Sequence, residues 1–294
     1  MYIRTPLRYP GGKSVMTSFF ADLFEINHLE HITYAEPYAG GAGTAINLLL
    51  AEKVERIMIN DANVGLYSFW DSILNHTKEF VDRLQEIPVS LDEWRKQHEI
   101  LRSSKEPSFD LGFATFYMSR TNRSGILSAG PIGGSSEEKQ AMAKYKIDCR
   151  FKKDNLTYKI LAIAERKHHV VISNKDAIKF LKDLKGDDKF VYLDPPYYVN
   201  GKSLYMDYYH SSDHRLLADY LKSTMKFDWV LSYDNVKPIR DLYKGYELYE
   251  FDLKYTANIK KSGAELLTFS KNIILPCEKR IKRRTENLYL KKIE

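Results

Sequence analysis

The segment of this chain best suited to chemistry is Asp194-Pro195-Pro196-Tyr197, which directly follows an apolar run at residues 190–193. Proline fixes its own φ angle and pushes the residue before it toward extended geometry, so the turn is predicted to be stiff. A stiff turn at the end of a buried strand can aim the Asp194 carboxylate and the Pro195 carbonyl oxygen at an amino group. Tyr197 offers a ring on which a base could stack. The segment therefore predicts a site that holds an amine ready for alkylation.

A second segment is rich in glycine and reads Glu36-Pro37-Tyr38-Ala39-Gly40-Gly41-Ala42-Gly43. It follows a predicted strand and opens a predicted helix, and its glycines let the backbone pass close to a ligand. The Glu36 carboxylate could hold a cation, an amine or a hydroxyl group. A nicotinamide dinucleotide is a weak interpretation, because the glycines miss the third position of the G-x-G-x-x-G/A fingerprint and an acid next to proline suits a pyrophosphate poorly.

Asp61 follows the next predicted strand, residues 56–60. In a doubly wound sheet, an acid at the end of the second strand reaches ribose hydroxyl groups. Capping of the following helix is the structural alternative. We favour ribose binding because the glycine-rich segment precedes it.

A third segment, Tyr9-Pro10-Gly11-Gly12-Lys13-Ser14, ends like a phosphate-binding loop. That motif needs glycine where Leu7 stands and a strand before the loop, so ATP binding is not predicted. A surface turn that carries a lysine is an equal alternative.

The elements that must position these segments are short apolar runs that alternate with helical patterns, as in an open α/β sheet. The predicted strands are residues 32–36, 56–60, 169–173, 190–194, 228–233, 247–251 and 266–276, the last poorly bounded near Lys271-Asn272. The predicted helices between them include residues 44–52, 175–184 and 213–223. Such a sheet binds ligands beyond the carboxyl ends of its strands, where the strand order reverses.

Charge, cysteine content and histidine spacing restrict the classes of function. The formal charge of +6 over 294 residues favours a polyanionic partner. Cys149 and Cys277 have no paired spacing, which argues against a disulfide framework and a thiolate zinc site. His210 and His214 stand at helical spacing without a third ligand, so we expect solvated histidines and no metal. The lack of a long apolar run or signal-peptide pattern predicts a cytoplasmic protein.

Together these segments resemble the alpha-group DNA adenine-N6 methyltransferases of the Dam type, over most of the chain and in the same order. The resemblance implies a Rossmann-like sheet that binds S-adenosyl-L-methionine. It places the cofactor against Tyr9, Lys13, Glu36, Pro37, Tyr38, Gly40, Gly41, Gly43, Asp61, Asp176 and Asp194. It assigns catalysis to Asp194, Pro195, Pro196 and Tyr197.

The alternation of strands and helices breaks in the middle of the chain, where the pattern is mainly helical. We therefore predict a catalytic domain at residues 1–65 and 166–276, an inserted helical DNA-recognition domain at 66–165, and a basic tail at 277–294. Residues 119–125 are similar to the recognition segment of the family, but Ser119 and Ser124 depart from its commonest version, so no target sequence is inferred. The expected DNA contacts are Arg120, Asn122, Arg123, Lys152 and Lys153.

The predicted reaction is methylation of adenine N6 in double-stranded DNA after extrusion of the base. Asp194 and the Pro195 carbonyl would accept the two amino hydrogens and localise the nitrogen lone pair. Cytosine-N4 methylation is an alternative with the same amine geometry, although such enzymes more often carry serine in place of Asp194. A second alternative is a non-catalytic DNA-binding subunit of a restriction-modification system, whose partner would be a cognate endonuclease. RNA or protein-amide methylation fits less well, because the insertion resembles a DNA-recognition domain.

Overall fold

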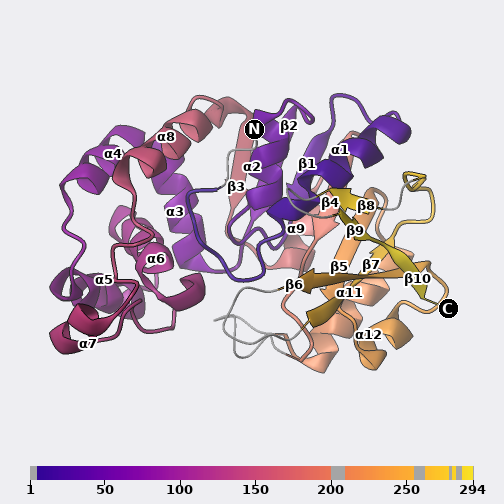
Figure 1. Cartoon of the computed structure of the whole chain (residues 1–294). Helices are drawn as coiled ribbons and strands as arrows, with labels where there is room; N and C mark the ends of the chain where they lie inside the picture. The colour runs from indigo at the N-terminus through magenta and orange to yellow at the C-terminus, as the bar shows by residue number, and fades with distance from the viewer. Residues whose placement is uncertain (1–4, 200–208, 255–261, 278–279, 283–286, 294) are drawn as a thin grey trace.

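A computed structural model describes residues 5–199, 209–254, 262–277, 280–282 and 287–293 (Figure 1). Its centre is an eight-stranded sheet in the order β10-β6-β7-β5-β4-β1-β2-β3, and β8 pairs with β9 in a separate ribbon. The strands are β1 (Thr33–Glu36), β2 (Arg56–Asn60), β3 (Val170–Ser173), β4 (Lys189–Leu193), β5 (Asp228–Asp234), β6 (Leu248–Lys254), β7 (Ser262–Phe269), β8 (Arg280–Lys282), β9 (Asn287–Tyr289) and β10 (Lys291–Ile293).

The direction and order of the strands define the fold. β1 to β5 run parallel to one another, whereas β7 lies antiparallel between β5 and β6. β1 pairs with β2 on one side and with β4 on the other, so the strand order reverses between β1 and β4. A doubly wound sheet binds its ligands at such a reversal. The predicted Rossmann-like α/β sheet is confirmed.

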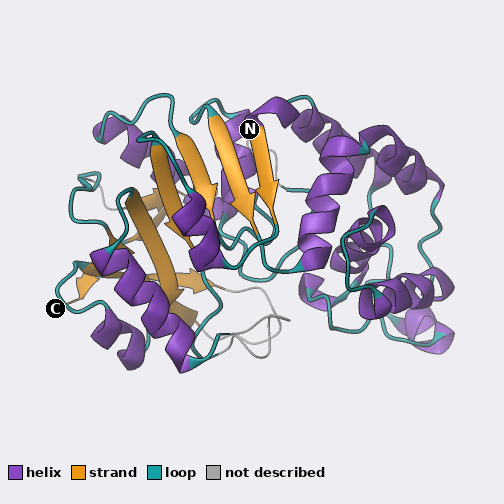
Figure 2. Cartoon of the chain, turned by 180° about the vertical axis from the view of Figure 1, so that it is seen from behind, coloured by secondary structure: helices purple, strands orange, loops and turns teal. Residues whose placement is uncertain are grey.

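Helices cover both faces of the sheet because side chains alternate along each strand. Tyr34 and Phe190 face one core, with α1 (Thr17–Ile26) and α2 (Gly43–Leu50). Ala35 and Val191 face the other core, which is covered by the remaining helices of the sheet region. These are α9 (Ala177–Asp183), α11 (Ser211–Ser223) and α12 (Lys237–Leu242), seen in front of the sheet in Figure 2.

The stretch between β2 and β3 is helical and lies beside the sheet (Figure 1). Its helices are α3 (Val64–Asn75), α4 (Thr77–Glu86), α5 (Leu91–Ser103), α6 (Phe109–Thr121), α7 (Glu137–Met142) and α8 (Lys153–Ala164). Ser90 and Ser108 accept backbone N–H groups at the starts of α5 and α6, as N-cap residues do. Buried Phe116 and Leu156 belong to the same apolar core as Tyr34 of β1. The helices therefore share a continuous core with the sheet.

Two expectations for the end of the chain were wrong. The predicted strand at residues 266–276 instead begins at Ser262 and ends at Phe269, and the chain then turns, with the Ile273 N–H donating to the Ser270 carbonyl oxygen. The expected separate tail instead contributes strands, and β10 pairs antiparallel with β6 at the edge of the main sheet. Residues 278–279, 283–286 and 294 of that tail lie outside the described residues.

The tail joins the fold because apolar residues are spaced among its basic ones. Ile281, Leu288 and Leu290 are all buried, and they belong to the core that contains α1. Burial of alternate residues in short strands supplies the free energy that anchors an otherwise charged segment.

Candidate active site

The glycine-rich segment that begins at Glu36 and the turn that begins at Asp194 meet where the strand order reverses. β1 ends at Glu36 and β4 ends just before Asp194, and these two strands are parallel neighbours. The lysine turn joins them, since the Thr44 hydroxyl donates to the Lys13 carbonyl oxygen at 2.8 Å. A Cβ atom on Gly43 would lie 3.1 Å from the Ser14 Cβ, so the turn packs closely against the start of α2. Three segments far apart in the sequence therefore form one site.

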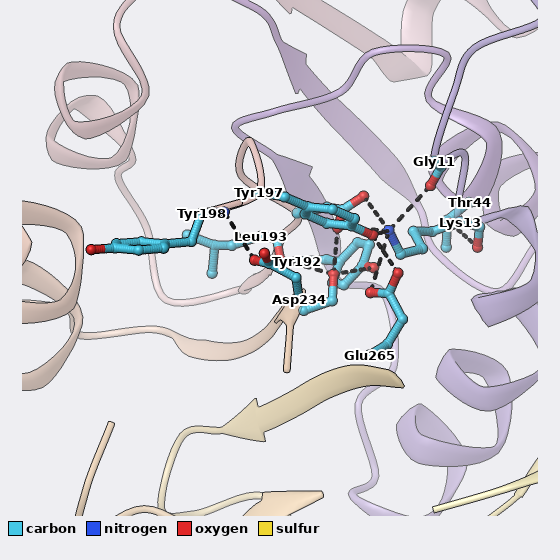
Figure 3. A network of polar contacts seen from close by, with 11 residues as sticks. Gly11, Lys13, Thr44, Tyr192, Leu193, Tyr197, Tyr198, Asp234 and Glu265 are labelled. Carbon is cyan, nitrogen blue, oxygen red and sulfur yellow. Dashed lines mark hydrogen bonds and ion pairs between the residues drawn. The ribbon is translucent and has the colours of Figure 1, made fainter. Parts of the chain in front are cut away.

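Lys13 lies at the centre of the polar network in Figure 3. Its ammonium group is 2.8 and 2.9 Å from the two carboxylate oxygens of Asp194. It also donates to the Tyr197 hydroxyl at 2.8 Å and to the Gly11 carbonyl oxygen at 3.1 Å. Lys13 is only 4% exposed, and a buried charged group of this kind persists only when it is paired and hydrogen-bonded. The Asp194 carboxylate thus holds an N–H donor with both of its oxygens.

The Asp194 carboxylate is also oriented from the side of β5. The Ser232 hydroxyl donates to its Oδ1 at 2.6 Å, and the Tyr192 hydroxyl lies 2.8 Å from the Ser232 oxygen. Beyond the two prolines, the carboxylate of Asp234 accepts the N–H groups of Tyr198 and Val199 at 2.9 and 3.0 Å. The turn is held at both ends, so the orientation of Asp194 is set before any substrate binds.

Tyr197 is buried, and its hydroxyl group points into the network rather than toward solvent. It donates a hydrogen bond to Glu265 of β7 and accepts one from Lys13. The ring is therefore held in one orientation by two charged groups. The stacking of a base on this ring stays a prediction.

Glu265 is a member of this network that the sequence analysis missed. Its carboxylate lies 3.7 Å from the Lys13 ammonium group and accepts the Tyr197 hydroxyl. Burial raises the pKa of Glu265 to about 7, although the positive charge of Lys13 lowers it. A glutamate inside the otherwise apolar run at residues 264–267 was the available signal, since a lone acid within a buried strand requires a partner.

The glycine loop folds around Tyr9 and Asp61. Gly40 has a φ angle of +49°, and a Cβ atom there would lie 2.6 Å from the Tyr9 ring, so only glycine fits. The Gly40 N–H donates to Asp61 Oδ2 at 2.8 Å. The helix that follows is capped by Asn63, which accepts the Leu66 N–H at 3.1 Å, so the capping alternative for Asp61 was wrong. Asp61 therefore lies beside the glycine loop, and its binding of a ribose stays a prediction.

Glu36 is buried at the start of α2. Its Oε1 accepts the Tyr34 hydroxyl at 3.0 Å and the Ala45 N–H at 3.1 Å. Burial raises the pKa of Glu36 to about 8, although these two hydrogen bonds oppose the shift. The nearby negative charge of Asp194 raises it further. A ligand carrying a positive charge would favour the ionised form of this carboxyl group.

Comparison with known protein families decides the class of this site. The model of the D12 class N6 adenine-specific DNA methyltransferases matches residues 9–257. The chain belongs to this family. It is therefore an adenine-specific DNA methyltransferase.

Solved structures that match this chain share little of its sequence. A conserved hypothetical protein from Streptococcus pyogenes is 9% identical, with a TM-score of 0.34 over 86% of this chain and 97% of that chain. The rRNA methyltransferase AviRa from Streptomyces viridochromogenes is 14% identical, with a TM-score of 0.38 over 90% of this chain and 89% of that chain. No match was found among curated proteins.

Three further residues lie in the glycine loop or in the segments tied to it. The Tyr38 hydroxyl lies 2.7 Å from that of Tyr209, and Asp176 caps α9 by accepting the Lys179 N–H at 3.0 Å. Asn60, which the sequence analysis missed, donates to the carbonyl oxygens of Pro37 and Lys175 at 3.0 and 2.9 Å. It thereby ties the glycine loop to the turn that carries Asp176.

The residues expected to contact DNA differ in their exposure. Arg123 and Lys152 are exposed, whereas Lys153 is half-buried and donates to the Gln85 carbonyl oxygen at 2.6 Å. Arg120 is turned inward, with its Nε atom 2.9 Å from the Arg150 carbonyl oxygen and its Nη1 atom 3.4 Å from that of Pro6.

Asn122 is fully buried, which does not fit a direct DNA contact in this structure. Its amide donates to the Ile126 and Leu127 carbonyl oxygens and accepts the Trp94 indole N–H at 2.7 Å. The signal in the sequence, an asparagine beside two arginines, does not distinguish a base contact from a residue that shapes the loop. Asn122 shapes the loop.

The expectation of two solvated histidines was wrong for His214. This side chain is buried, its Nδ1 atom lies 2.7 Å from the Tyr233 hydroxyl, and its ring packs against that of Tyr198. Within the described part of the chain, no cluster of three or more potential metal ligands occurs. Across those same residues, none of the helices combines the length and apolar character of a membrane span.

Proposed function

We propose that this methyltransferase transfers a methyl group from S-adenosyl-L-methionine to N6 of adenine in double-stranded DNA, and that it is of the alpha-group Dam type. One observation supports the proposal above all others: a carboxylate at the end of β4 binds an N–H donor with both oxygens. The Lys13 ammonium group stands in for the amino group of a substrate. A base amine bound beside Asp194 would meet the same carboxylate.

The catalytic roles follow from the chemistry of that amine. Asp194 and the Pro195 carbonyl oxygen would accept the two hydrogens of N6, which localises the lone pair of the nitrogen. The Ser232 hydroxyl, donating at 2.6 Å, keeps the carboxylate in the required orientation. Such positioning supplies much of the rate acceleration in a displacement at carbon. Pro196 stiffens the turn, and Tyr197 is proposed to stack on the base.

The residues on the other side of the site fit S-adenosyl-L-methionine, which supplies an electrophilic methyl group when bound. Two acidic residues stand at the carboxyl ends of neighbouring strands, Glu36 as the last residue of β1 and Asp61 directly after β2. Carboxylates there suit a ligand that has hydroxyl groups and a positive charge. Gly40 and Gly41 let the backbone approach it closely. The remaining proposed contacts are Tyr9, Lys13, Pro37, Tyr38, Gly43, Asp176 and Asp194.

The helical insertion at residues 66–165 is proposed as the DNA-recognition domain. Exposed Arg123 and Lys152 would contact phosphates or base edges. The target adenine would be extruded from the duplex, because its amino group is engaged in base pairing inside it. A cognate restriction endonuclease is the partner that a restriction-modification system would supply. We propose the cytoplasm as the location, since the DNA substrate is accessible there.

The first test is the substitution Asp194→Ala. It should reduce transfer of tritiated methyl groups to DNA by about a thousandfold, because the amino hydrogen loses its carboxylate acceptor. Glu99→Ala, on the exposed side of α5, is the control and should keep the wild-type rate. Transfer by the Asp194 variant at the wild-type rate would refute the role.

The position of the methyl group tests the assignment to adenine N6. Digested product DNA should contain N6-methyladenine and no N4-methylcytosine. Sequencing of the modified sites should show one short target sequence in duplex DNA. Labelled N4-methylcytosine would favour the cytosine alternative, and a protein that binds DNA without any transfer would favour the non-catalytic one.

A further inference from the structure

Two carboxylates flank one ammonium group in the active site. Lys13 lies 2.8 Å from Asp194 and 3.7 Å from Glu265, and all three side chains come from different parts of the chain. We infer that Glu265 is a positioning residue, which draws the Lys13 ammonium group away from Asp194 when the amino group of the target base arrives. This inference rests on the proposed function of Asp194 as the acceptor of that amino group.

Such a residue assists the reaction, because Lys13 and the target amine compete for the carboxylate of Asp194. The ammonium group occupies both oxygens of Asp194, and Ser232 donates to one of them as well. A carboxylate has about four acceptor positions, so one remains on Oδ2, and an amine that takes it is crowded by the neighbouring ammonium group. Movement of Lys13 away from Oδ2 relieves this competition. A buried cation that loses its counter-charge is strongly disfavoured. Glu265 offers a second carboxylate within reach, so a small movement of Lys13 keeps the cation paired.

Tyr197 contacts Lys13 and also Glu265, the carboxylate toward which Lys13 is inferred to move. Its hydroxyl donates to Glu265 and accepts from Lys13, so the same tyrosine contacts both the lysine and its second carboxylate. The movement of Lys13 toward Glu265 can occur while this hydroxyl keeps a hydrogen bond with each. Figure 3 shows the three groups converging from the turn, the end of β4 and β7. The target amine would then find the Asp194 carboxylate already oriented by Ser232.

The charge of Glu265 should be visible in the pH dependence of the reaction. The ionisable groups that face it are Lys13, Asp194, Tyr197 and Asp234. Burial raises the pKa of Glu265 to about 7, so the carboxyl group gains its proton as the pH falls through that value. A neutral Glu265 cannot stabilise the displaced ammonium group. The methyl-transfer rate of the wild type should therefore fall on the acid side of about pH 7.

The test is Glu265→Gln, which keeps the shape of the side chain and removes its charge. At saturating cofactor and DNA, the single-turnover rate should fall about tenfold or more, and the acid limb of the pH profile should disappear. The affinity for the cofactor, measured by calorimetry, should change by less than about twofold. Glu265→Asp, which retains the charge, should recover part of the rate and the acid limb. Glu250→Gln on the neighbouring β6 is the matched control and should behave as the wild type.

A double variant decides whether Glu265 acts through Lys13. In a Lys13→Met protein, the further change Glu265→Gln should lower the rate by less than about twofold, since the cation it stabilises is gone. A full additional loss in the double variant, or a wild-type rate and pH profile in the single variant, would overturn the inference. If Glu265→Gln does not fold, loss of the acid limb in Glu265→Asp would overturn it. A wild-type protein that methylates no adenine would instead refute the proposed function, and the inference would fall with it.

Discussion

At the scale of single residues, the active site depends on charges that are buried next to one another. Lys13, Asp194 and Glu265 form one cationic and two acidic positions within a few ångströms. The cation lowers the cost of burying the acids, and the acids lower the cost of burying the cation. Truncation of any one of them therefore changes the ionisation of the other two. Changes in shape and changes in charge must be separated in experiments on this site.

Glu36 provides a prediction at the same scale. Its pKa is about 8 in the folded protein and near 4.5 when unfolded, so the folded state retains a proton between these values. The stability of the wild type should fall as the pH rises through this window, by about 1.4 kcal/mol per unit where the difference is fully developed. Glu36→Gln lacks this loss. Without cofactor, the melting temperature of Glu36→Gln minus that of the wild type should increase by several degrees as the pH is raised from 5 to 8.5.

The control for Glu36 is the same chemical change at an exposed position, Glu99→Gln on α5. Its melting temperature should follow that of the wild type at every pH. Parallel pH curves for the wild type and Glu36→Gln, measured by differential scanning calorimetry, would contradict a proton held by Glu36.

At the scale of elements, the site depends on where strands end and on how closely helices approach. β1 and β4 are neighbours, so their carboxyl ends bring Glu36 and Asp194 to one edge although more than half of the chain separates them in sequence. The helical part depends in the same way on the contact between α3 and α6. A Cβ atom on Gly112 would lie 2.4 Å from the Ser68 carbonyl oxygen, so these helices cross with no space for a side chain.

Gly112→Ala tests this crossing. The added methyl group meets backbone atoms, which cannot move aside, so the free energy of unfolding should fall by about 1–3 kcal/mol. Gly130→Ala is the matched control, because its Cβ atom would meet only the end of the Arg123 side chain, at 3.3 Å. Urea denaturation should place the control within about 0.5 kcal/mol of the wild type. An unchanged midpoint for Gly112→Ala would show that α3 and α6 pack less closely.

At the scale of the whole molecule, the helices and the sheet form a single body with a shared core on one side of the sheet. A net charge of +6 attracts a polyanion to this body but does not direct the polyanion to one surface. To direct DNA to the surface around the active site, the protein needs exposed basic groups on that surface. Arg123 and Lys152 are exposed, whereas the guanidinium group of Arg120 binds backbone carbonyl oxygens of the chain itself.

Arg123→Ala should therefore weaken DNA binding in a salt-dependent way. Loss of one phosphate contact should flatten the plot of log affinity against log salt concentration by about one unit of slope. Lys226→Ala is the control, because this exposed lysine precedes β5 at the opposite edge of the sheet and should leave the slope unchanged. Fluorescence anisotropy at several salt concentrations measures both. Equal slopes for the wild type and Arg123→Ala would move the DNA surface elsewhere.

Much of the fold could be predicted from local patterns. Alternating strands and helices, the glycine turn at Gly40 and the stiff turn after β4 depend on backbone preferences of nearby residues, which a sequence displays directly. The meeting of Asp194 and Tyr197 in one polar network was predictable for the same reason, since they are neighbours in one motif. The family resemblance added Asp61 and Lys13 to the residues that were predicted to lie at the site.

Only the tertiary structure could decide contacts between distant segments and the burial of polar side chains. Glu265 enters the site because β7 runs antiparallel beside β5, a pairing that no local pattern specifies. Asn122 resembles a DNA contact in sequence and proves to be buried, because its partners Trp94 and Leu127 become neighbours only in the folded chain. The chain alone determines which residues can do chemistry, and packing determines which of them face one another, since burial and pairing depend on the whole fold.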